Sequence, residues 1–291
     1  MKVVLLLLPG LGTILFLMGD AFYTTISHSL GLGSEENRLT LQYWNEMLSD
    51  SILWRSVGYS FRTSLLGTLG AVLLAYPIAL WLTKPLQGKN LIIGMLRAPM
   101  FVPGLVAAFL LMNVISYHGI INEGLLAIGV IDKPIRMIND SFGWSVVFLQ
   151  IWKNLPFALI LISGSVNSIR TDLLHAASDM GASRFAKFRQ VIFPLTIPAL
   201  QASMILIFIG AMGDYAFASI AGSRTSYSMT MLMYFTAYQY LEWEKVYVIA
   251  VVLMTIAALG AIVITAVLQP FARKRYSLIS LDKAGLDGVA K

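Results

Sequence analysis

The chain has 291 residues, of which 57% are hydrophobic and only 12% are charged. Soluble domains carry about 25% charged residues, so this composition excludes an ordinary soluble domain and indicates a chain embedded in lipid. Cysteine is absent, which excludes disulfides, thiolate metal sites and cysteine nucleophiles. The formal net charge of +6 suits nucleic acid by its sign alone, so its distribution along the chain has to be considered.

Six stretches are long and apolar enough to cross a bilayer. About 20 apolar residues span the ~30 Å hydrocarbon core as a helix. A helix also satisfies its own backbone in lipid, and the alternation typical of barrel strands is missing. We therefore predict an all-α membrane protein with one domain over 1–291 and six transmembrane helices, at about 3–23, 57–82, 91–117, 143–164, 195–220 and 246–268.

The first stretch has a second interpretation, because Lys2 precedes an apolar run as it would in a signal peptide. The run is longer than a signal-peptide core, and no small-x-small cleavage site follows it. We therefore expect a retained helix at 3–23.

Prolines and small residues predict where the later helices kink and pack. Proline lacks an amide N–H, so we expect kinks or interruptions where neighbouring groups satisfy the freed carbonyls. Small residues in the second and fifth stretches favour close helix contacts. The prolines are Pro77, Pro99, Pro103 and Pro156, and the small residues are Ser64, Gly67, Thr68, Ala71, Gly210 and Gly213.

Lysine and arginine concentrate in alternate connecting segments. By the positive-inside rule, these segments face the cytoplasm. We therefore predict that both termini, a polar tail at 270–291 and the connection at 170–194 are cytoplasmic, with longer acidic loops outside. The basic residues then report topology, and we expect no nucleic-acid partner. The residues are Lys2, Lys84, Lys89, Arg97, Arg170, Arg184, Lys187, Arg189, Arg273, Lys274, Arg275, Lys283 and Lys291.

The connection at 170–194 has the pattern of two short helices joined by a tight turn. Thr171 or Asp172 is expected to cap the first helix, and Ser183 the second. Gly181 lies where a helix ends in a left-handed residue. From pattern alone, an amphipathic basic helix resting on anionic headgroups is the alternative.

The same connection resembles the EAA loop of ABC-transporter permeases. That motif reads acid-Ala-Ala, three residues, Gly, nine residues, an aliphatic residue, one residue, Leu-Pro. Ala176, Ala177, Gly181, Val191 and Pro194 lie at these spacings. The sequence departs from the motif in two places: His175 replaces the acidic residue, and Phe193 replaces the leucine.

Three further segments, "GVIDKPIRM", "NLPFALILISGSVNSI" and "AMGDYAFASIAG", resemble permeases of spermidine/putrescine-type importers. That group also has relatives for iron(III), thiamine and aminoalkylphosphonates. The resemblance implies a permease subunit that moves a small polar solute inward by alternating access. It also implies a coupling helix between the fourth and fifth transmembrane helices that docks on an ATPase. The implied coupling residues are Asp172, His175, Ala176, Ala177, Gly181, Ala182, Arg184, Phe185, Arg189 and Pro194.

The partners that the resemblance implies are two cytoplasmic ATPase subunits, a second related permease chain, an extracytoplasmic solute-binding protein and the lipid of a bacterial inner membrane. The chain itself has no Walker A loop, because "QGKN" at 87–90 lacks the first glycine and the hydroxyl residue. His28, His118 and His175 are far apart, so no catalytic or metal-binding motif is formed. We expect no enzymatic activity and no cofactor, with ATP bound by the partner subunits.

Charged residues inside the apolar stretches are candidates for the solute pathway, since each costs about 2.5–3.5 kcal/mol to insert. These candidates are Lys153 and Asn154 in the fourth stretch and Asp214 and Tyr215 in the fifth. The alternative is a structural pair of Lys153 with Asp214, or snorkelling of each to an interface. Asp20 is expected to be structural.

A buried lysine would repel a polycation unless Asp214 neutralised it, so the solute class stays open between a polyamine-like cation and an anionic or zwitterionic solute such as an aminoalkylphosphonate. A secondary transporter or channel without an ATPase is the alternative function. Inverted repeats and a charged site at the midplane would favour it, and only Lys153 meets the second condition.

Overall fold

The computed structural model describes residues 2–33, 38–138, 140–223 and 225–289, and side chains between 9 and 271 within these ranges. All regular structure in these ranges is helical, which confirms the predicted all-α class. The elements in chain order are α1 (Lys2–Ser29), α2 (Gln42–Ser49), α3 (Ser51–Trp81), α4 (Lys89–Arg97), η1 (Ala98–Phe101), α5 (Gly104–Ile115), α6 (Ile120–Ala127), α7 (Trp144–Asn167), α8 (Thr171–Asp179), α9 (Arg184–Lys187), η2 (Phe188–Ile192), α10 (Phe193–Met212), α11 (Ala216–Ala221), α12 (Met229–Tyr238) and α13 (Trp243–Val289).

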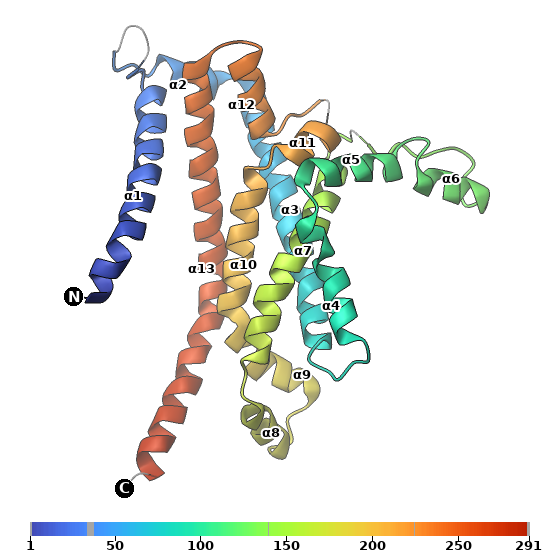
Figure 1. The fold of residues 1–291 in the computed structure, drawn as a ribbon, viewed down its shortest axis with the longest axis vertical. Coiled ribbons are helices and arrows are strands. Elements are labelled where there is room, and N and C mark those ends of the chain that lie inside the picture. Colours follow the sequence, from blue (N-terminus) through green and yellow to red (C-terminus); the bar gives the residue numbers. More distant parts are fainter. Residues whose placement is uncertain (1, 34–37, 139, 224, 290–291) are drawn as a thin grey trace.

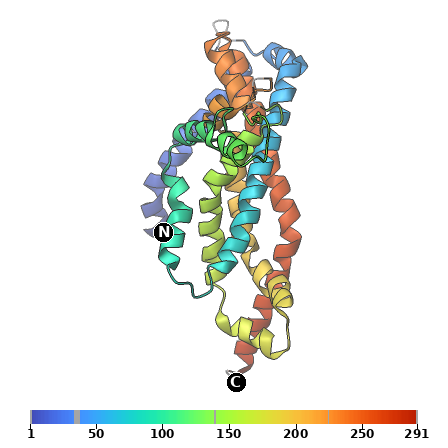
Figure 2. The ribbon, with the colours of Figure 1, turned by 90° about the vertical axis from the view of Figure 1, so that its right-hand side faces the viewer.

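Four long helices, α3, α7, α10 and α13, form the bundle at the centre of the molecule (Figures 1 and 2). Helix α3 packs on α7 and α10, α10 packs on α13, and α1 lies against α13. The short helices α8 and α9 lie at one end of the bundle, and α2 and α12 lie at the other (Figure 1). Fully buried apolar side chains from all four helices form the core, among them Ala71, Ala75, Ala158, Ile162, Ile197, Ile207, Val248 and Ile249.

Glycine sets the distance between α3 and α7. A β-carbon added at Gly67 would lie 2.5 Å from Cβ of Gln150, so a larger residue would separate the two helices. This close contact confirms the small-residue packing predicted for the second stretch.

The corresponding prediction for Gly210 on α10 is wrong, because a β-carbon there would meet no atom within 4 Å. Helix α10 instead approaches α13 closely at Phe208, whose ring would lie 2.2 Å from a β-carbon at Gly260. A bulky aromatic side chain, and not a glycine, thus fills the contact on the α10 side.

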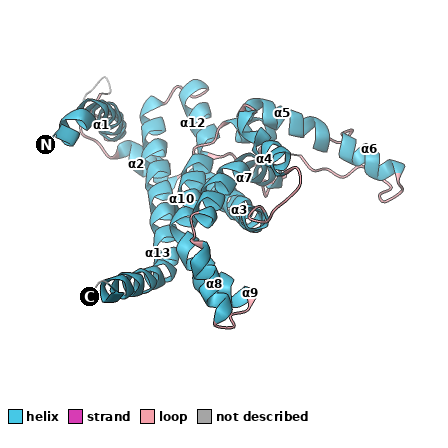
Figure 3. Cartoon of the chain, turned by 60° about the horizontal axis from the view of Figure 1, so that its bottom comes forward, coloured by secondary structure: helices cyan, strands magenta, loops and turns pink. Residues whose placement is uncertain are grey.

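The stretch at 91–117 is not one helix, and the interruption predicted at Pro99 and Pro103 is confirmed. The chain forms α4 and η1, leaves helical geometry at Val102 and begins again as α5. Pro99 lies in η1 and Pro103 is the N-cap residue of α5, so neither supplies the amide N–H that a continuous helix needs. Helices α5 and α6 extend sideways from the bundle (Figures 1 and 3).

Five segments of the described chain are long and apolar enough to cross a membrane: Ser51–Trp81, Gly104–Ala127, Trp144–Asn167, Arg184–Met212 and Trp243–Phe271. The second segment combines α5 and α6. The class of multi-pass membrane protein is confirmed, whereas the predicted number of six is not reproduced in the described residues. The stretch at 3–23 is helical within α1, and its role as a transmembrane helix stays a prediction.

The last two predicted transmembrane helices differ from the structure at their ends. Helix α10 stops at Met212, and a short interruption separates it from α11, so the stretch at 195–220 is not one helix. Helix α13 covers 246–268 and continues to Val289, so the expected polar tail at 270–291 is α-helical as far as that residue.

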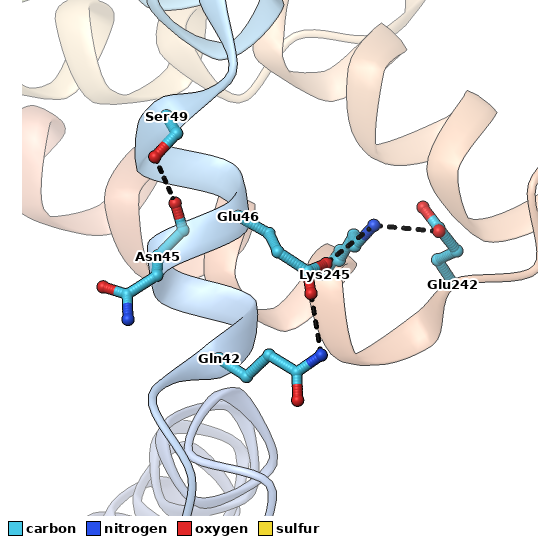
Figure 4. Close-up of polar contacts among 6 residues, drawn as sticks. All are labelled: Gln42, Asn45, Glu46, Ser49, Glu242 and Lys245. Atoms are coloured by element: carbon cyan, nitrogen blue, oxygen red, sulfur yellow. Dashed lines mark hydrogen bonds and ion pairs between the residues drawn. The ribbon is translucent and has the colours of Figure 1, made fainter.

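A polar cluster joins α2 to the start of α13, at the end opposite α8 (Figure 4). Lys245 Nζ lies 3.1 Å from a carboxylate oxygen of Glu46 and 2.9 Å from one of Glu242. Gln42 also donates a hydrogen bond of 2.8 Å to Glu46. These contacts, first the hydrogen bond from Gln42 and then that from Lys245, hold the pKa of the exposed Glu46 carboxyl below its usual value.

Candidate functional site

The connection between α7 and α10 forms two short helices joined by a tight turn, as predicted. Helix α8 ends at Asp179, and Gly181 just beyond it has a φ of +79°. The N–H of Ala182 donates to the carbonyl of Ala177 at 2.9 Å, and the N–H of Gly181 donates to that of Ser178 at 2.9 Å. This pair of bonds is the Schellman motif, whose left-handed residue favours glycine because glycine has no β-carbon. The predicted left-handed cap at Gly181 is confirmed.

The predicted caps of the two helices have different outcomes. Ser183 caps α9, since its hydroxyl accepts a hydrogen bond of 3.2 Å from the N–H of Ala186. The prediction of Thr171 or Asp172 as the cap of α8 is wrong, because the N-cap position belongs to Arg170 and has no side-chain cap. The Asp172 carboxylate instead forms an ion pair of 3.2 Å with Arg170. Thr171 and Asp172 thus lie in the first turn of α8 and not before it.

A further bond fixes α8 against α9. Lys187 Nζ donates to the hydroxyl of Ser178 at 3.0 Å. The two helices therefore form one unit, which we call the elbow (residues 171–187).

The elbow has an exposed face that combines apolar and basic side chains. Met180 is 84% exposed, Phe185 69% and Leu173 42%. Among the predicted coupling residues, seven are exposed, one is half-buried and two are buried. The exposed ones are Asp172, His175, Ala176, Gly181, Arg184, Phe185 and Arg189, the half-buried one is Ala182, and the buried ones are Ala177 and Pro194. The loop thus presents large apolar side chains away from the bundle, which is typical of a surface that binds another protein.

The elbow continues directly into α10 through the π-helical turn η2. Helical structure is unbroken from Arg184 to Met212, so this helix begins before the predicted bound at 195. Pro194 lacks the N–H that would bond the carbonyl of Gln190, and a π-helical turn is a usual way for a helix to accommodate such a local irregularity. The elbow and α10 are thus one mechanical element.

Lys153 lies at the break between η1 and α5, and its role in a solute pathway stays a prediction. Its ammonium donates hydrogen bonds to the carbonyls of Pro99 at 2.9 Å and Met100 at 3.1 Å, and also to that of Val102. These carbonyls belong to the broken third stretch, where the helical donors are missing. One charged side chain of α7 therefore satisfies three backbone acceptors of a neighbouring segment.

The alternative of a structural Lys153–Asp214 pair is wrong, since neither residue forms an ion pair in the described chain. The Asp214 carboxylate instead accepts a hydrogen bond of 2.7 Å from the N–H of Phe217 at the start of α11. Its backbone carbonyl accepts 2.9 Å from the hydroxyl of Thr230 on α12. Asp214 thus joins α10, α11 and α12.

The other two pathway candidates have separate surroundings. The amide of Asn154 donates to the backbone carbonyl and side-chain oxygen of Gln150, one turn earlier on α7, at 2.9 and 2.8 Å. Tyr215 is 38% exposed, and its ring lies 5.4 Å from that of Tyr234 on α12. The structure therefore does not bring the four candidates together.

A buried asparagine, Asn122, organises the α5–α6 arm and was not predicted. Asn122 is fully buried, and its amide donates to the carbonyls of Ser116 at 3.0 Å and Ile135 at 2.9 Å. Its side-chain oxygen accepts 2.8 Å from the N–H of Ile135. No local pattern marks this asparagine, because its partner lies 13 residues away in a loop.

The described residues contain no group of three or more His, Asp or Glu side chains placed to hold a metal ion. Nothing in the described chain therefore suggests a metal centre, and the distinctive features are the elbow and the lysine-filled break.

The family comparison matches residues 57–277 to the model described as the binding-protein-dependent transport system inner membrane component. The spermidine/putrescine permease PotB of Escherichia coli (strain K12) is 32% identical over 184 residues, 63% of this chain and 66% of that protein. The trehalose/maltose permease MalF of Thermococcus litoralis is 25% identical over 246 residues, covering 81% and 80%.

Solved structures share the fold. A bacterial ABC transporter involved in the import of alginate aligns with a TM-score of 0.74 at 16% identity, over 92% of this chain and 96% of that one. The MetNI methionine transporter aligns with a TM-score of 0.58 at 15% identity, over 76% and 96%. The region that matches the family model includes the elbow, the break at Val102, α7, α10 and most of α3 and α13. The chain belongs to the family of binding-protein-dependent transport system inner membrane components.

Proposed function

We propose that this chain is the membrane-spanning permease subunit of an ATP-driven importer, and that the elbow is its contact with a separate ATPase. The observation that carries the proposal is the continuity of the elbow with α10. A partner bound to Met180 and Phe185 would contact the elbow, whose second helix runs unbroken into α10. Movement of the ATPase could then be transmitted as rigid-body motion of helices.

Other features support the remaining partners. The α5–α6 arm exposes large apolar side chains, with Phe109 at 63%, Leu110 at 55% and Ile120 at 74%. Such a surface suits a second permease chain that would complete the solute path. Two ATPase subunits, one for each permease chain, would follow, together with a solute-binding protein at the end formed by α2, α11 and α12. ATP would be bound and hydrolysed by the ATPase subunits.

The topology proposed from the basic residues agrees with the arrangement of the helices. The elbow and the C-terminal end of α13 lie at the same end of the bundle (Figure 1). Both segments are rich in lysine and arginine, so that end would face the cytoplasm of a cell with this chain in its inner membrane.

A polyamine-like cation is the solute class we favour. The positive charge of Lys153 was the argument against a cationic solute. Its ammonium, however, donates hydrogen bonds to three backbone carbonyls, whose dipoles partly offset that charge. The repulsion that a free lysine would exert on a passing cation is reduced accordingly. The likeness to the spermidine/putrescine permease supports the same class.

The test is a gentle detergent purification of the tagged chain from its host, with identification of the co-purifying chains by mass spectrometry. We expect an ATPase with a Walker A motif and a second permease. The associated binding protein would be titrated by calorimetry with putrescine, spermidine and 2-aminoethylphosphonate, and we expect heat from the polyamines.

A chain that purifies without any ATPase, at low as well as high salt, would contradict the importer. The ATPase-independent secondary transporter or channel would then be favoured. Binding of 2-aminoethylphosphonate alone would leave the importer intact and reject the polyamine class.

A further inference from the structure

We propose that Tyr76 is a positioning residue for the coupling step, because its hydroxyl bonds Thr196 in the first turn of α10, and Thr196 in turn bonds the last residue of η2, the turn that links the elbow to α10. The inference rests on the proposed role of the elbow as the ATPase contact. It adds a second route by which a displacement of the elbow reaches the bundle, through α3 as well as along α10.

The hydrogen bonds around Tyr76 have a defined direction. Tyr76 Oη lies 2.5 Å from Thr196 Oγ1, and both side chains are buried. Thr196 Oγ1 in turn lies 3.0 Å from the carbonyl of Ile192 and 3.1 Å from that of Phe193. Carbonyls only accept, so the single hydroxyl proton of Thr196 points to them and Tyr76 donates to Thr196. The relay therefore runs from α3 to the last residue of η2.

The turn η2 is the part of this element that most needs an external tie. Pro194 and Pro198 both lack an N–H, so the carbonyls of Gln190 and Pro194 have no helical donor four residues on. A helix with missing bonds bends more easily there than elsewhere. Without a tie, part of any displacement of the elbow would be lost as bending at η2.

Aromatic packing holds the Tyr76 ring independently of its hydroxyl. The ring meets that of Phe188 edge-on, with centroids 5.8 Å apart, and lies 6.2 Å from that of Phe193. Phe193 also contacts Phe271 on α13, at 6.1 Å. Removal of the hydroxyl alone should therefore leave the ring in place.

An apolar cavity of about 400 Å³ lies beside this contact. Tyr76, Phe188 and Phe193 line it, together with Leu73 and Met204. The cavity gives η2 room to shift relative to α3 once the hydrogen bond is absent. The buried hydroxyl pair is then the specific restraint that keeps the two helices moving together.

The experiment uses the purified assembly with its ATPase and permease partners, reconstituted in liposomes with binding protein and putrescine. Putrescine uptake and ATP hydrolysis are measured in the same vesicles for wild type and Tyr76→Phe. We expect hydrolysis to persist, and the putrescine imported per ATP to fall about fivefold, the factor a single buried hydrogen bond contributes. Thr196→Val should reproduce this loss, and the double variant should be no worse than either single one.

The matched control is Thr265→Val, which removes the 3.2 Å hydrogen bond between Gln201 of α10 and Thr265 of α13. Its import per ATP should equal that of wild type. An unchanged ratio in Tyr76→Phe, or an equal loss in Thr265→Val, would overturn the inference while leaving the importer in place. A wild-type assembly that hydrolyses ATP without importing any solute would instead contradict the proposed function.

Discussion

Two interruptions in the transmembrane region are stabilised in opposite ways. At Val102 the third stretch stops being helical, and the ammonium of Lys153 closes its free carbonyls from the neighbouring helix α7. At η2 the helix continues as a π-helical turn, and the hydroxyls of Thr196 and Tyr76 supply its additional bonds. The first interruption changes the course of the chain, whereas the second preserves it.

The difference follows from how many donors are missing. A complete break frees several carbonyls in one place, and only a side chain with three donors, such as lysine, satisfies them together. At η2 the prolines leave only the carbonyls of Gln190 and Pro194, at separate positions, without a helical donor, and the helix continues. The hydroxyl of Thr196 adds bonds to the neighbouring carbonyls of Ile192 and Phe193. The comparison indicates a fixed joint at Lys153 and a transmitting joint at η2.

The largest effect is expected at the fixed joint. Lys153→Met should lower the free energy of unfolding by about 2–3 kcal/mol, because three backbone carbonyls at the break lose the ammonium donor. Thermal unfolding of the purified chain in detergent measures this loss. Lys153→Arg keeps the positive charge and the donors, so it should recover part of the stability. A methionine variant as stable as wild type would mean that water or the α5 backbone closes the break without lysine.

The elbow gives the next largest effect. Gly181→Pro cannot adopt the φ of +79° and removes the N–H that bonds Ser178, so uptake should be abolished while membrane insertion is preserved. Insertion is followed by membrane fractionation and uptake by a labelled solute. Gly181→Asn is the control, since asparagine tolerates the left-handed region and the site has open space around it. Normal uptake by the proline variant would show that the elbow geometry is not needed for coupling.

A neutral amide offers a test of whether charge matters at an interruption. Asn122 closes the turn between α5 and α6 with three hydrogen bonds and no charge. Asn122→Ala should cost about 2 kcal/mol, less than the lysine variant, and hydrogen exchange at residues 116–135 should accelerate. Asn122→Asp keeps the acceptor but sets a carboxylate oxygen against the carbonyls of Ser116 and Ile135 in a buried site, so it should cost more than alanine. Equal losses at Lys153 and Asn122 would mean that the number of bonds, and not the charge, sets the cost.

The smallest effect is expected for Glu46, a carboxylate at the surface. The lowered pKa of Glu46 means that its contacts with Gln42 and Lys245 stabilise the fold above the usual carboxyl pKa of 4.5, and that this contribution is lost as pH falls through the lowered value. We expect Glu46→Gln to remove that pH dependence with little change in Tm at pH 7. Melting curves between pH 7 and pH 3 measure the difference. A large fall in Tm of Glu46→Gln at pH 7 would mean that this exposed cluster stabilises the fold as strongly as Lys153 does.

The local features of the molecule were predictable where a single residue decides them. The αL cap at Gly181 and the cap at Ser183 follow from short-range preferences, and both are confirmed. The cap of α8 was misassigned by one or two residues, since the short polar side chains of Thr171 and Asp172 suit a cap that Arg170 occupies. Asn122 and Tyr76 could not be found, because their partners come from distant parts of the chain.

By itself the sequence determined the class of the protein: apolar stretches of sufficient length, the elbow between two of them and the absence of catalytic motifs. These features depend on composition and on residues within a few turns of one another. Pro99 and Pro103 indicated an interruption within the stretch at 91–117, and only the tertiary structure decided that it lies at Val102 and that Lys153 fills it. The physical reason is that hydropathy measures the cost of leaving water, whereas the course of a helix in lipid depends on which neighbouring helix supplies the missing hydrogen bonds.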